Sequence, residues 1–136
     1  MIDRARLREW ARAALVAHDV RPADPALAAG ALSGGNQQKL VVARELTRPG
    51  VRTVIAAQPT RGVDFGAVAG IHDRLQAIAA AGVGMLLVSA DLDELFALSH
   101  RIVVMHRGRI VGELAGAELA RADSRTRIGQ WMTGVG

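Results

Sequence analysis

The octet Leu32-Ser33-Gly34-Gly35-Asn36-Gln37-Gln38-Lys39 and the apolar segment 40–46 that follows it decide the fold. Ser33 is a preferred N-cap residue, so the sequence predicts a helix that begins directly after it. Gly34 and Gly35 lack side chains, which lets a ligand or another surface approach their backbone. Unpaired amides and the positive end of the helix dipole would then face outward, an arrangement that suits phosphate.

The tripeptide Ser-Gly-Gly alone favours a capped helix that binds nothing. The whole octet changes this interpretation, because Asn36, Gln37 and Gln38 place neutral hydrogen-bond donors beside the amides. Such donors suit polyphosphate oxygens. The octet is therefore a candidate phosphate-contacting site.

Composition sets broad limits on the fold and on the function. The chain has 136 residues, the length of one domain, and it is 50% hydrophobic but only 3% aromatic, so its core must consist of Ala, Val, Leu and Ile. A net charge of +4 suits a nucleotide, a nucleic acid or an anionic membrane. The chain has no cysteine, which excludes disulfides and thiolate chemistry. No apolar run approaches the roughly 20 residues of a membrane span, and Met1 does not begin a secretory signal, so we expect a soluble, cytoplasmic chain.

The N-terminal third predicts two helices separated by a loop. Asp3 can cap the first helix, which has one apolar face. The loop 21–25 contains two prolines, and Pro49-Gly50 is expected to end the helix that follows the octet. The apolar face of the first helix comprises Leu7, Trp10, Ala11, Ala14 and Leu15, and Arg4, Arg8 and Arg12 line another face.

The remainder alternates between strands and helices. Segment 51–57 is a strand candidate, and Asp64 can cap a helix with Val68, Ile71, Leu75 and Ile78 on its inner face. Segment 84–89 predicts a strand buried on both faces, and Asp91 can cap a short helix. Segments 102–106 and 109–114 predict a hairpin, and 125–132 a helix with Ile128 and Trp131 turned inward. This order predicts an α/β layered core with mostly parallel strands and flanking helices.

The octet resembles the signature motif of ABC-transporter ATPases, and its Asn-Gln-Gln-Lys ending is similar to the variant found in bacterial importers of simple sugars and nucleosides. The likeness extends from about residue 7 to the C-terminus. It implies a partial P-loop NTPase domain, with 1–48 as the end of the helical subdomain and 49–136 as the remainder of the core. No G-x-x-x-x-G-K-[ST] phosphate loop is present. Without the phosphate-loop strand, the sheet has a gap between segments 84–89 and 102–106, or those strands pair directly.

The same resemblance implies that this half of the ATPase is catalytically inactive. The family's metal-holding aspartate and water-polarising glutamate align with Ala57 and Gln58, and its switch histidine aligns with Ala90. Alanine offers no oxygen to a metal, and glutamine takes no proton at neutral pH. The four histidines lack the spacing of metal ligands. We therefore expect no catalytic residue, no metal ligand and no hydrolysis by this chain alone.

The intact signature implies a role in a partner's site. Family halves dock head to tail, so Ser33, Gly34, Gly35, Asn36 and Gln37 are expected to contact ATP held, with Mg²⁺, by another ABC ATPase half. Asp64 matches the aspartate of the loop at that interface, and it is equally a helix cap. The resemblance further implies membrane permease partners, a location at the inner face of the membrane, and a subunit of a sugar or nucleoside importer. The segment 56–62 looks most like the nucleoside branch.

The sequence leaves three alternatives to this role. The chain is alternatively a non-catalytic interaction module, which the missing phosphate loop favours, or a truncated fragment with no function of its own. Chromosome-maintenance ATPases also carry a signature of this type, but they have long coiled coils. No heptad pattern is present here, so we expect no nucleic-acid partner.

Overall fold

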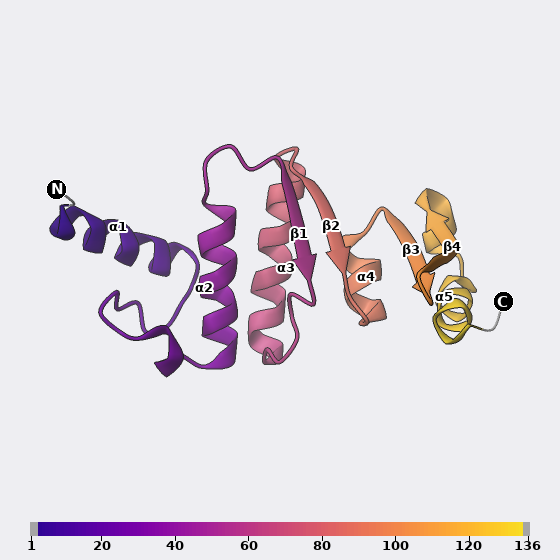
Figure 1. Cartoon of the computed structure of the whole chain (residues 1–136), viewed down its shortest axis with the longest axis horizontal. Helices are drawn as coiled ribbons and strands as arrows, with labels where there is room; N and C mark the ends of the chain where they lie inside the picture. Colours follow the sequence, from indigo (N-terminus) through magenta and orange to yellow (C-terminus); the bar gives the residue numbers. More distant parts are fainter. Residues whose placement is uncertain (1–2, 135–136) are drawn as a thin grey trace. The chain divides into compact units, whose positions relative to one another are not determined.

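The computed structural model describes residues 3–134 and divides into two compact units at residues 86/87. The first unit ends at Leu86 and the second begins at Leu87; Figure 1 shows the helices and strands of each. In the described part of the chain, no helix is both long enough and apolar enough to cross a membrane. The predicted division into 1–48 and 49–136 remains a prediction.

Helix α1 (Arg4–Ala17) begins where the sequence predicts. The Asp3 carboxylate caps it by accepting hydrogen bonds from the amides of Ala5 (3.0 Å) and Arg6 (3.1 Å). Only the last turn of its apolar face reaches the core. Leu15 is buried against Val20 and Leu32, whereas the Leu7 and Trp10 side chains stay exposed.

A short 3₁₀ turn, η1 (Ala29–Ala31), leads into α2 (Gly34–Leu46), which ends three residues before the predicted stop at Pro49-Gly50. Helix α3 (Phe65–Ala80) packs beside it and buries Ala67, Ile71 and Leu75. Gly82, with φ +88°, follows the C-cap of α3, where its left-handed backbone turns the chain toward the next strand.

Strands β1 (Thr53–Ala57) and β2 (Gly84–Val88) form a two-stranded sheet and run in the same direction (Figure 1). The prediction that segment 84–89 is buried on both faces is wrong. Both strands alternate between half-buried and exposed residues, and Ile55 and Leu86 are 70% and 55% exposed. In the described chain nothing covers that face, whereas an all-parallel sheet ordinarily has both faces covered.

The second unit contains α4 (Leu92–Leu98), β3 (Arg101–His106), β4 (Arg109–Ala115), η2 (Gly116–Ala120) and α5 (Ser124–Thr133). The predicted hairpin is confirmed: β3 and β4 pair antiparallel around Arg107 and Gly108, both with positive φ. Its core consists of Ile102, Val104, Leu114 and Ile128, and Trp131 packs against it as predicted.

The described strands form two separate sheets, β1–β2 and β3–β4. Among residues 3–134, β2 and β3 are not hydrogen-bonded neighbours, so the alternative in which those two strands pair directly is not observed.

Candidate functional site

The start of α2 is built as the octet predicts. The Ser33 hydroxyl accepts a hydrogen bond from the Asn36 amide (3.4 Å), and the Ser33 carbonyl accepts one from the Gln37 amide (2.8 Å). These bonds satisfy two of the first N–H groups of the helix. Among residues 3–134, no protein acceptor pairs with the amides of Gly34 and Gly35.

The exposure of this tip differs between its residues. Ser33 and Gly34 are exposed, so the hydroxyl and the first free amide are open to an approaching group. Gly35 is buried. The dipole of a 13-residue helix adds partial positive charge at the same point. The tip can therefore donate hydrogen bonds to an anion, and a phosphate oxygen is the fitting acceptor.

Gly35 is buried because α3 begins directly against it. A Cβ atom at Gly35 would lie 2.8 Å from Asp64 Oδ2 and 3.4 Å from the Ala67 Cβ, and a Cβ at Gly34 would lie 3.3 Å from the Gly62 carbonyl oxygen. A side chain at Gly35 would push Asp64 aside. The close approach of the two helix starts therefore requires glycine.

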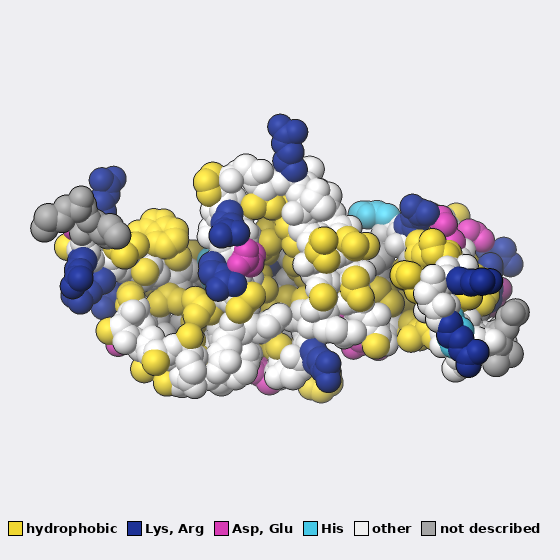
Figure 2. Space-filling view, viewed as in Figure 1, with side chains coloured by type: hydrophobic (Ala, Val, Ile, Leu, Met, Phe, Trp, Pro, Cys, Tyr) yellow, Lys and Arg dark blue, Asp and Glu magenta, His cyan; other side chains and the backbone are white. Residues whose placement is uncertain are grey.

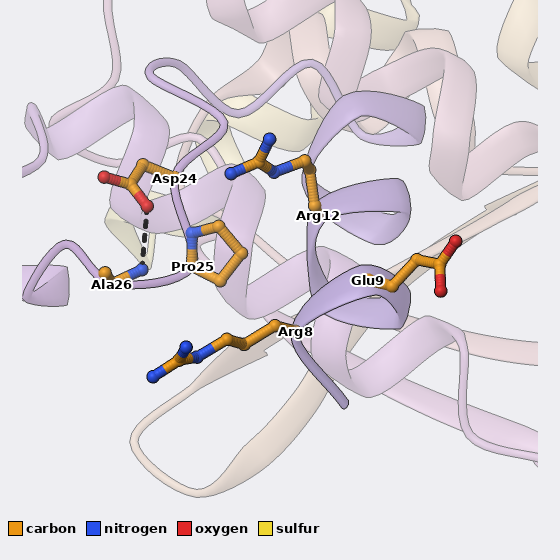
Figure 3. A pocket seen from close by; sticks show the side chains of 6 residues that line it. All are labelled: Arg8, Glu9, Arg12, Asp24, Pro25 and Ala26. Carbon is orange, nitrogen blue, oxygen red and sulfur yellow. Dashed lines mark hydrogen bonds between the residues drawn. The ribbon is translucent and has the colours of Figure 1, made fainter. Parts of the chain in front are cut away.

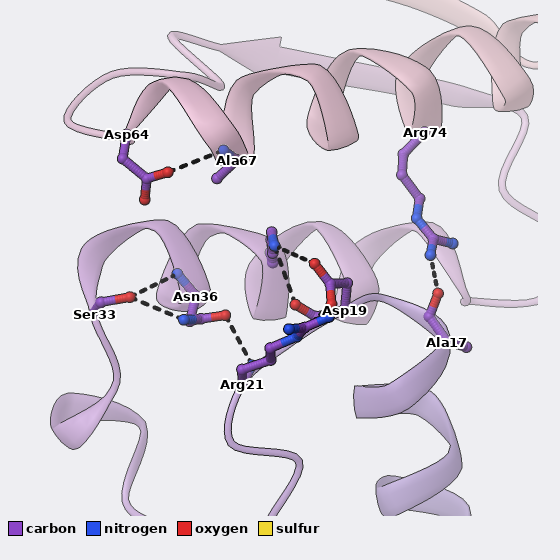
Figure 4. Close-up of polar contacts among 9 residues, drawn as sticks. Ala17, Asp19, Arg21, Ser33, Asn36, Asp64, Ala67 and Arg74 are labelled. Atoms are coloured by element: carbon purple, nitrogen blue, oxygen red, sulfur yellow. Dashed lines mark hydrogen bonds and ion pairs between the residues drawn. The ribbon is translucent and has the colours of Figure 1, made fainter.

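Asp64 lies at the N-terminus of α3, where its Oδ1 accepts a hydrogen bond from the Ala67 amide at 3.0 Å. Its role as a helix cap is confirmed. Because Asp64 is exposed beside the Gly34–Gly35 backbone, the structure brings together the two predicted site segments (Figure 4). Its role at an interface with another ATPase half remains a prediction.

The side-chain amides of Asn36 and Gln37 are engaged within the chain. Asn36 Nδ2 donates to Ser33 Oγ (2.9 Å), and Asn36 Oδ1 accepts from the Arg21 amide (2.8 Å), as Figure 4 shows. Gln37 Nε2 donates to the Leu32 carbonyl (2.8 Å). Each NH₂ group has a second hydrogen, so a contact with phosphate stays a prediction for both residues.

Lys39, the single lysine, supports the loop that follows α1. Its ammonium group donates to Asp19 Oδ2 (2.7 Å) and to the Asp19 carbonyl (3.1 Å). The hydrogen bond from Lys39, followed by that from Arg21, lowers the pKa of the Asp19 carboxyl below its usual value. The charge of Lys39 is thereby balanced by the Asp19 carboxylate.

The positions expected to be inactive carry no catalytic group. Ala57 is the last residue of β1, and Gln58 follows it with a φ of +50°. Ala90 lies exposed between β2 and α4. Within residues 3–134, no group of three or more His, Asp or Glu side chains is arranged to hold a metal ion.

Phe65 was not identified from the sequence. It is the first residue of α3, follows Asp64 directly and is 98% exposed. The helical spacing could have identified it. Phe65 is a large apolar residue at the start of the helix, and it lies outside the buried face formed by Ala67, Ile71 and Leu75. A fully exposed aromatic ring beside a candidate interface is a candidate contact residue.

Curated relatives and solved structures place this geometry in a family. The chain is 44% identical over 116 residues to the ribose import ATP-binding protein RbsA 2 of Burkholderia pseudomallei, which covers 85% of this chain and 22% of that protein. It is also 44% identical over 137 residues to the glucose import ATP-binding protein TsgD13 of Haloferax volcanii, covering 99% of this chain and 24% of that protein. No protein-family model matches the chain.

The fold is that of solved ATP-binding cassettes. MJ1267, an ATP-binding cassette of an ABC transporter, superposes with a TM-score of 0.73 at 23% identity, over 96% of this chain and 51% of that one. The dimeric cassette MJ0796 bound to ADP and Pi gives 0.71 at 22% identity, over 85% and 49%. The chain spans about a quarter of the length of the curated relatives it matches. This chain belongs to the ABC transporter ATPase family and carries part of one ATP-binding cassette.

Proposed function

We propose that this chain acts as a portion of an ABC importer ATPase and supplies its signature tip to a nucleotide held by another ATPase half. The observation that supports this role is the start of α2, where the exposed Ser33 hydroxyl adjoins the free Gly34 and Gly35 amides. Oriented donors of this kind stabilise developing phosphoryl charge without reorganisation. The relatives that match the chain are sugar importers by name, so a sugar or nucleoside importer is the proposed setting.

The division of labour follows from the residues present. This chain would contribute hydrogen bonds from Ser33 and the glycine amides, with Asn36, Gln37 and Asp64 beside them. The partner half would hold ATP and Mg²⁺ and would provide the groups that activate water. Closure of the composite site would be passed to membrane permease subunits at the inner face of the membrane.

The test pairs the purified chain with a catalytic ABC half whose own signature serine has been replaced. ATP hydrolysis is then measured with Ser33 intact and with Ser33→Arg. We expect Ser33→Arg to lower the rate at least about 100-fold, because losing one oriented donor to a transition state typically costs that much. The bulky cation would also block approach to Gly34.

Two controls make this result specific to the tip. Ser33→Thr keeps the hydroxyl and should retain most of the rate, and Thr126→Arg adds the same charge at an exposed position of α5 and should leave the rate unchanged. Equal rates for the intact chain and Ser33→Arg would contradict the proposal. Partner binding without nucleotide-dependent protection of the Gly34 and Gly35 amides would instead favour a non-catalytic interaction module.

A further inference from the structure

The contacts of the Ser33 side chain are made entirely within the first unit, between described residues. Hydrophobic side chains are widely exposed on the face that Figure 2 shows. Because the chain spans about a quarter of its curated relatives, that exposure reflects how much of the cassette it carries. The hydrogen bonds around Ser33 do not depend on what covers the surface.

The Asn36 side chain fits in one orientation only. Its Oδ1 accepts a hydrogen bond from the Arg21 amide at 2.8 Å, and its Nδ2 donates to Ser33 Oγ at 2.9 Å (Figure 4). A backbone N–H group is a donor and never an acceptor, so the atom that meets it must be the amide oxygen. Exchanging Oδ1 and Nδ2 would set two donors against each other. The Arg21 backbone therefore places the Asn36 NH₂ group on the Ser33 side.

The Ser33 hydroxyl is consequently an acceptor toward its own helix. Its oxygen accepts from Asn36 Nδ2 and, at 3.4 Å, from the Asn36 backbone amide. A hydroxyl has two acceptor lone pairs and one hydrogen, so both lone pairs are occupied. The hydrogen has no acceptor among residues 3–134, and Ser33 is exposed. It is therefore left to point outward, where it can be donated to a phosphate oxygen.

The loop that orients Asn36 is itself held by α2. Lys39, one turn further along the helix, donates to Asp19 Oδ2 at 2.7 Å and to the Asp19 carbonyl at 3.1 Å. The Arg21 guanidinium donates to Asp19 Oδ1 at 2.8 Å. Asp19 has a φ of +51°, which is uncommon for a residue other than glycine, and Val20 beside it is buried. These contacts fix the position of the Arg21 amide.

The rest of this loop forms no hydrogen bond with α2 in the described chain. The Asp24 carboxylate accepts from the Ala26 amide at 2.9 Å, within the loop. A cavity of about 450 Å³ lies between this part of the loop and α1 (Figure 3). The polar connection between the loop and α2 is therefore concentrated at residues 19–21.

The direction of the Ser33 hydrogen bond matters because an anionic phosphate oxygen accepts hydrogen bonds, and a lone pair turned toward it would repel it. We propose that Asn36 is a positioning residue, which fixes the Ser33 hydroxyl as a donor to the phosphate. The Lys39–Asp19 ion pair secures this arrangement by holding the loop that orients Asn36. The inference rests on the proposed function, since the phosphate belongs to the nucleotide of the other ATPase half.

The test pairs the full chain with a catalytic half whose own signature serine has been replaced. Asn36→Asp keeps the shape of the side chain and the bond to the Arg21 amide, but both of its oxygens are acceptors. The Ser33 hydroxyl would then donate to the introduced carboxylate and turn a lone pair outward. We expect ATP hydrolysis to fall about 10–100-fold, the worth of one hydrogen bond to a charged group, with the melting temperature unchanged.

A double variant shows whether Asn36 acts through Ser33. Ser33→Ala alone should lower the rate about 100-fold, and adding Asn36→Asp should lower it little further. A second fall of the same size would mean that the introduced charge acts on the nucleotide directly, which would overturn the positioning role. A loss with Ser33→Ala but none with Asn36→Asp would contradict this inference alone. No loss with Ser33→Ala would contradict the proposed function as well.

A second measurement needs neither nucleotide nor a partner half. Asn36 is the single asparagine of the chain, so isotope-labelled asparagine gives one side-chain amide group in an NMR spectrum. We expect Lys39→Met to shift or broaden its signals and to speed their hydrogen exchange, whereas Lys39→Arg, which keeps the charge, should largely preserve them. Asp24→Asn, at an aspartate of the same loop, should leave them unchanged. Signals that respond alike to Lys39→Met and Asp24→Asn, or to neither, would overturn the role of the ion pair.

Discussion

Asn36 joins the start of α2 to the loop that follows α1. Its side chain bonds the Ser33 hydroxyl and the Arg21 amide at once, so it fixes the cap and the loop in one geometry. The sequence showed an amide beside the glycines but could not show its partners, because Arg21 lies 15 residues away. Asn36 therefore has a structural role whether or not it also touches a nucleotide.

Replacing Asn36 with alanine should lower the free energy of unfolding by about 1–2 kcal/mol, because two hydrogen bonds of a half-buried side chain are lost. Urea unfolding followed by far-UV circular dichroism measures this change. Gln38→Ala is the matched control, since Gln38 is half-buried on the same helix and its side-chain amide forms no hydrogen bond within the described chain. It should stay within about 0.5 kcal/mol of the parent. Equal effects of the two variants would contradict this structural role.

At the level of single residues, the sequence predicted the caps best. Asp3, Ser33, Asp64 and Asp91 all cap the helices they were expected to begin, because a cap depends only on the next few residues. The exposure of side chains was predicted less well, because it depends on packing against residues that are distant in the sequence. Leu7, Trp10 and Phe65 are apolar by type but uncovered in the structure.

The hairpin and α5 show how two elements fit closely. Gly112 in β4 lies beneath the Trp131 indole of α5, and a Cβ atom at Gly112 would overlap that ring. Gly129, on α5 itself, has no neighbour within 4 Å of its ideal Cβ position. The same substitution should therefore have opposite effects at the two glycines.

Gly112→Ala should destabilise the second unit by about 1–3 kcal/mol, the usual cost of overpacking. Gly129→Ala should stabilise it by about 0.5–1 kcal/mol, because alanine is a better helix residue where space is free. Denaturant unfolding monitored by Trp131 fluorescence, in a Trp10→Phe background, measures both changes. A neutral Gly112→Ala would show that the indole can move aside without loss.

The strands show where local pattern stops being informative. The hairpin over 101–115 was predictable because Arg107 and Gly108 form a tight turn between neighbouring strands. The segment 84–89 was expected to be buried on both faces, since a run of apolar residues is typical of a central parallel strand. Burial of the second face requires another layer, and the described chain provides cover on one side only.

For the whole molecule, the exposed sheet face and the two separate sheets agree with the fraction of its relatives that the chain covers. The chain covers 51% of one solved cassette and about a quarter of its curated relatives. The apolar residues Ile55 and Leu86 are 70% and 55% exposed on a sheet of only two strands. Two strands are few for an independently stable sheet. We therefore expect complementary ATPase sequence to be needed before any nucleotide chemistry occurs.

The isolated chain should not hydrolyse ATP. Phosphoryl transfer needs a phosphate cradle and a metal-holding acid, and this chain has no G-x-x-x-x-G-K-[ST] loop and carries alanine at positions 57 and 90. Phosphate release from Mg-ATP should equal that of buffer. The triple variant Ala57→Asp, Gln58→Glu and Ala90→His should be equally inactive. The introduced side chains cannot act on a triphosphate that no phosphate loop holds in place. ATP hydrolysis that co-purifies with the parent chain through successive columns would contradict the expected inactivity of the parent and of the triple variant. ATP hydrolysis by the triple variant alone would show that the chain holds nucleotide without a phosphate loop.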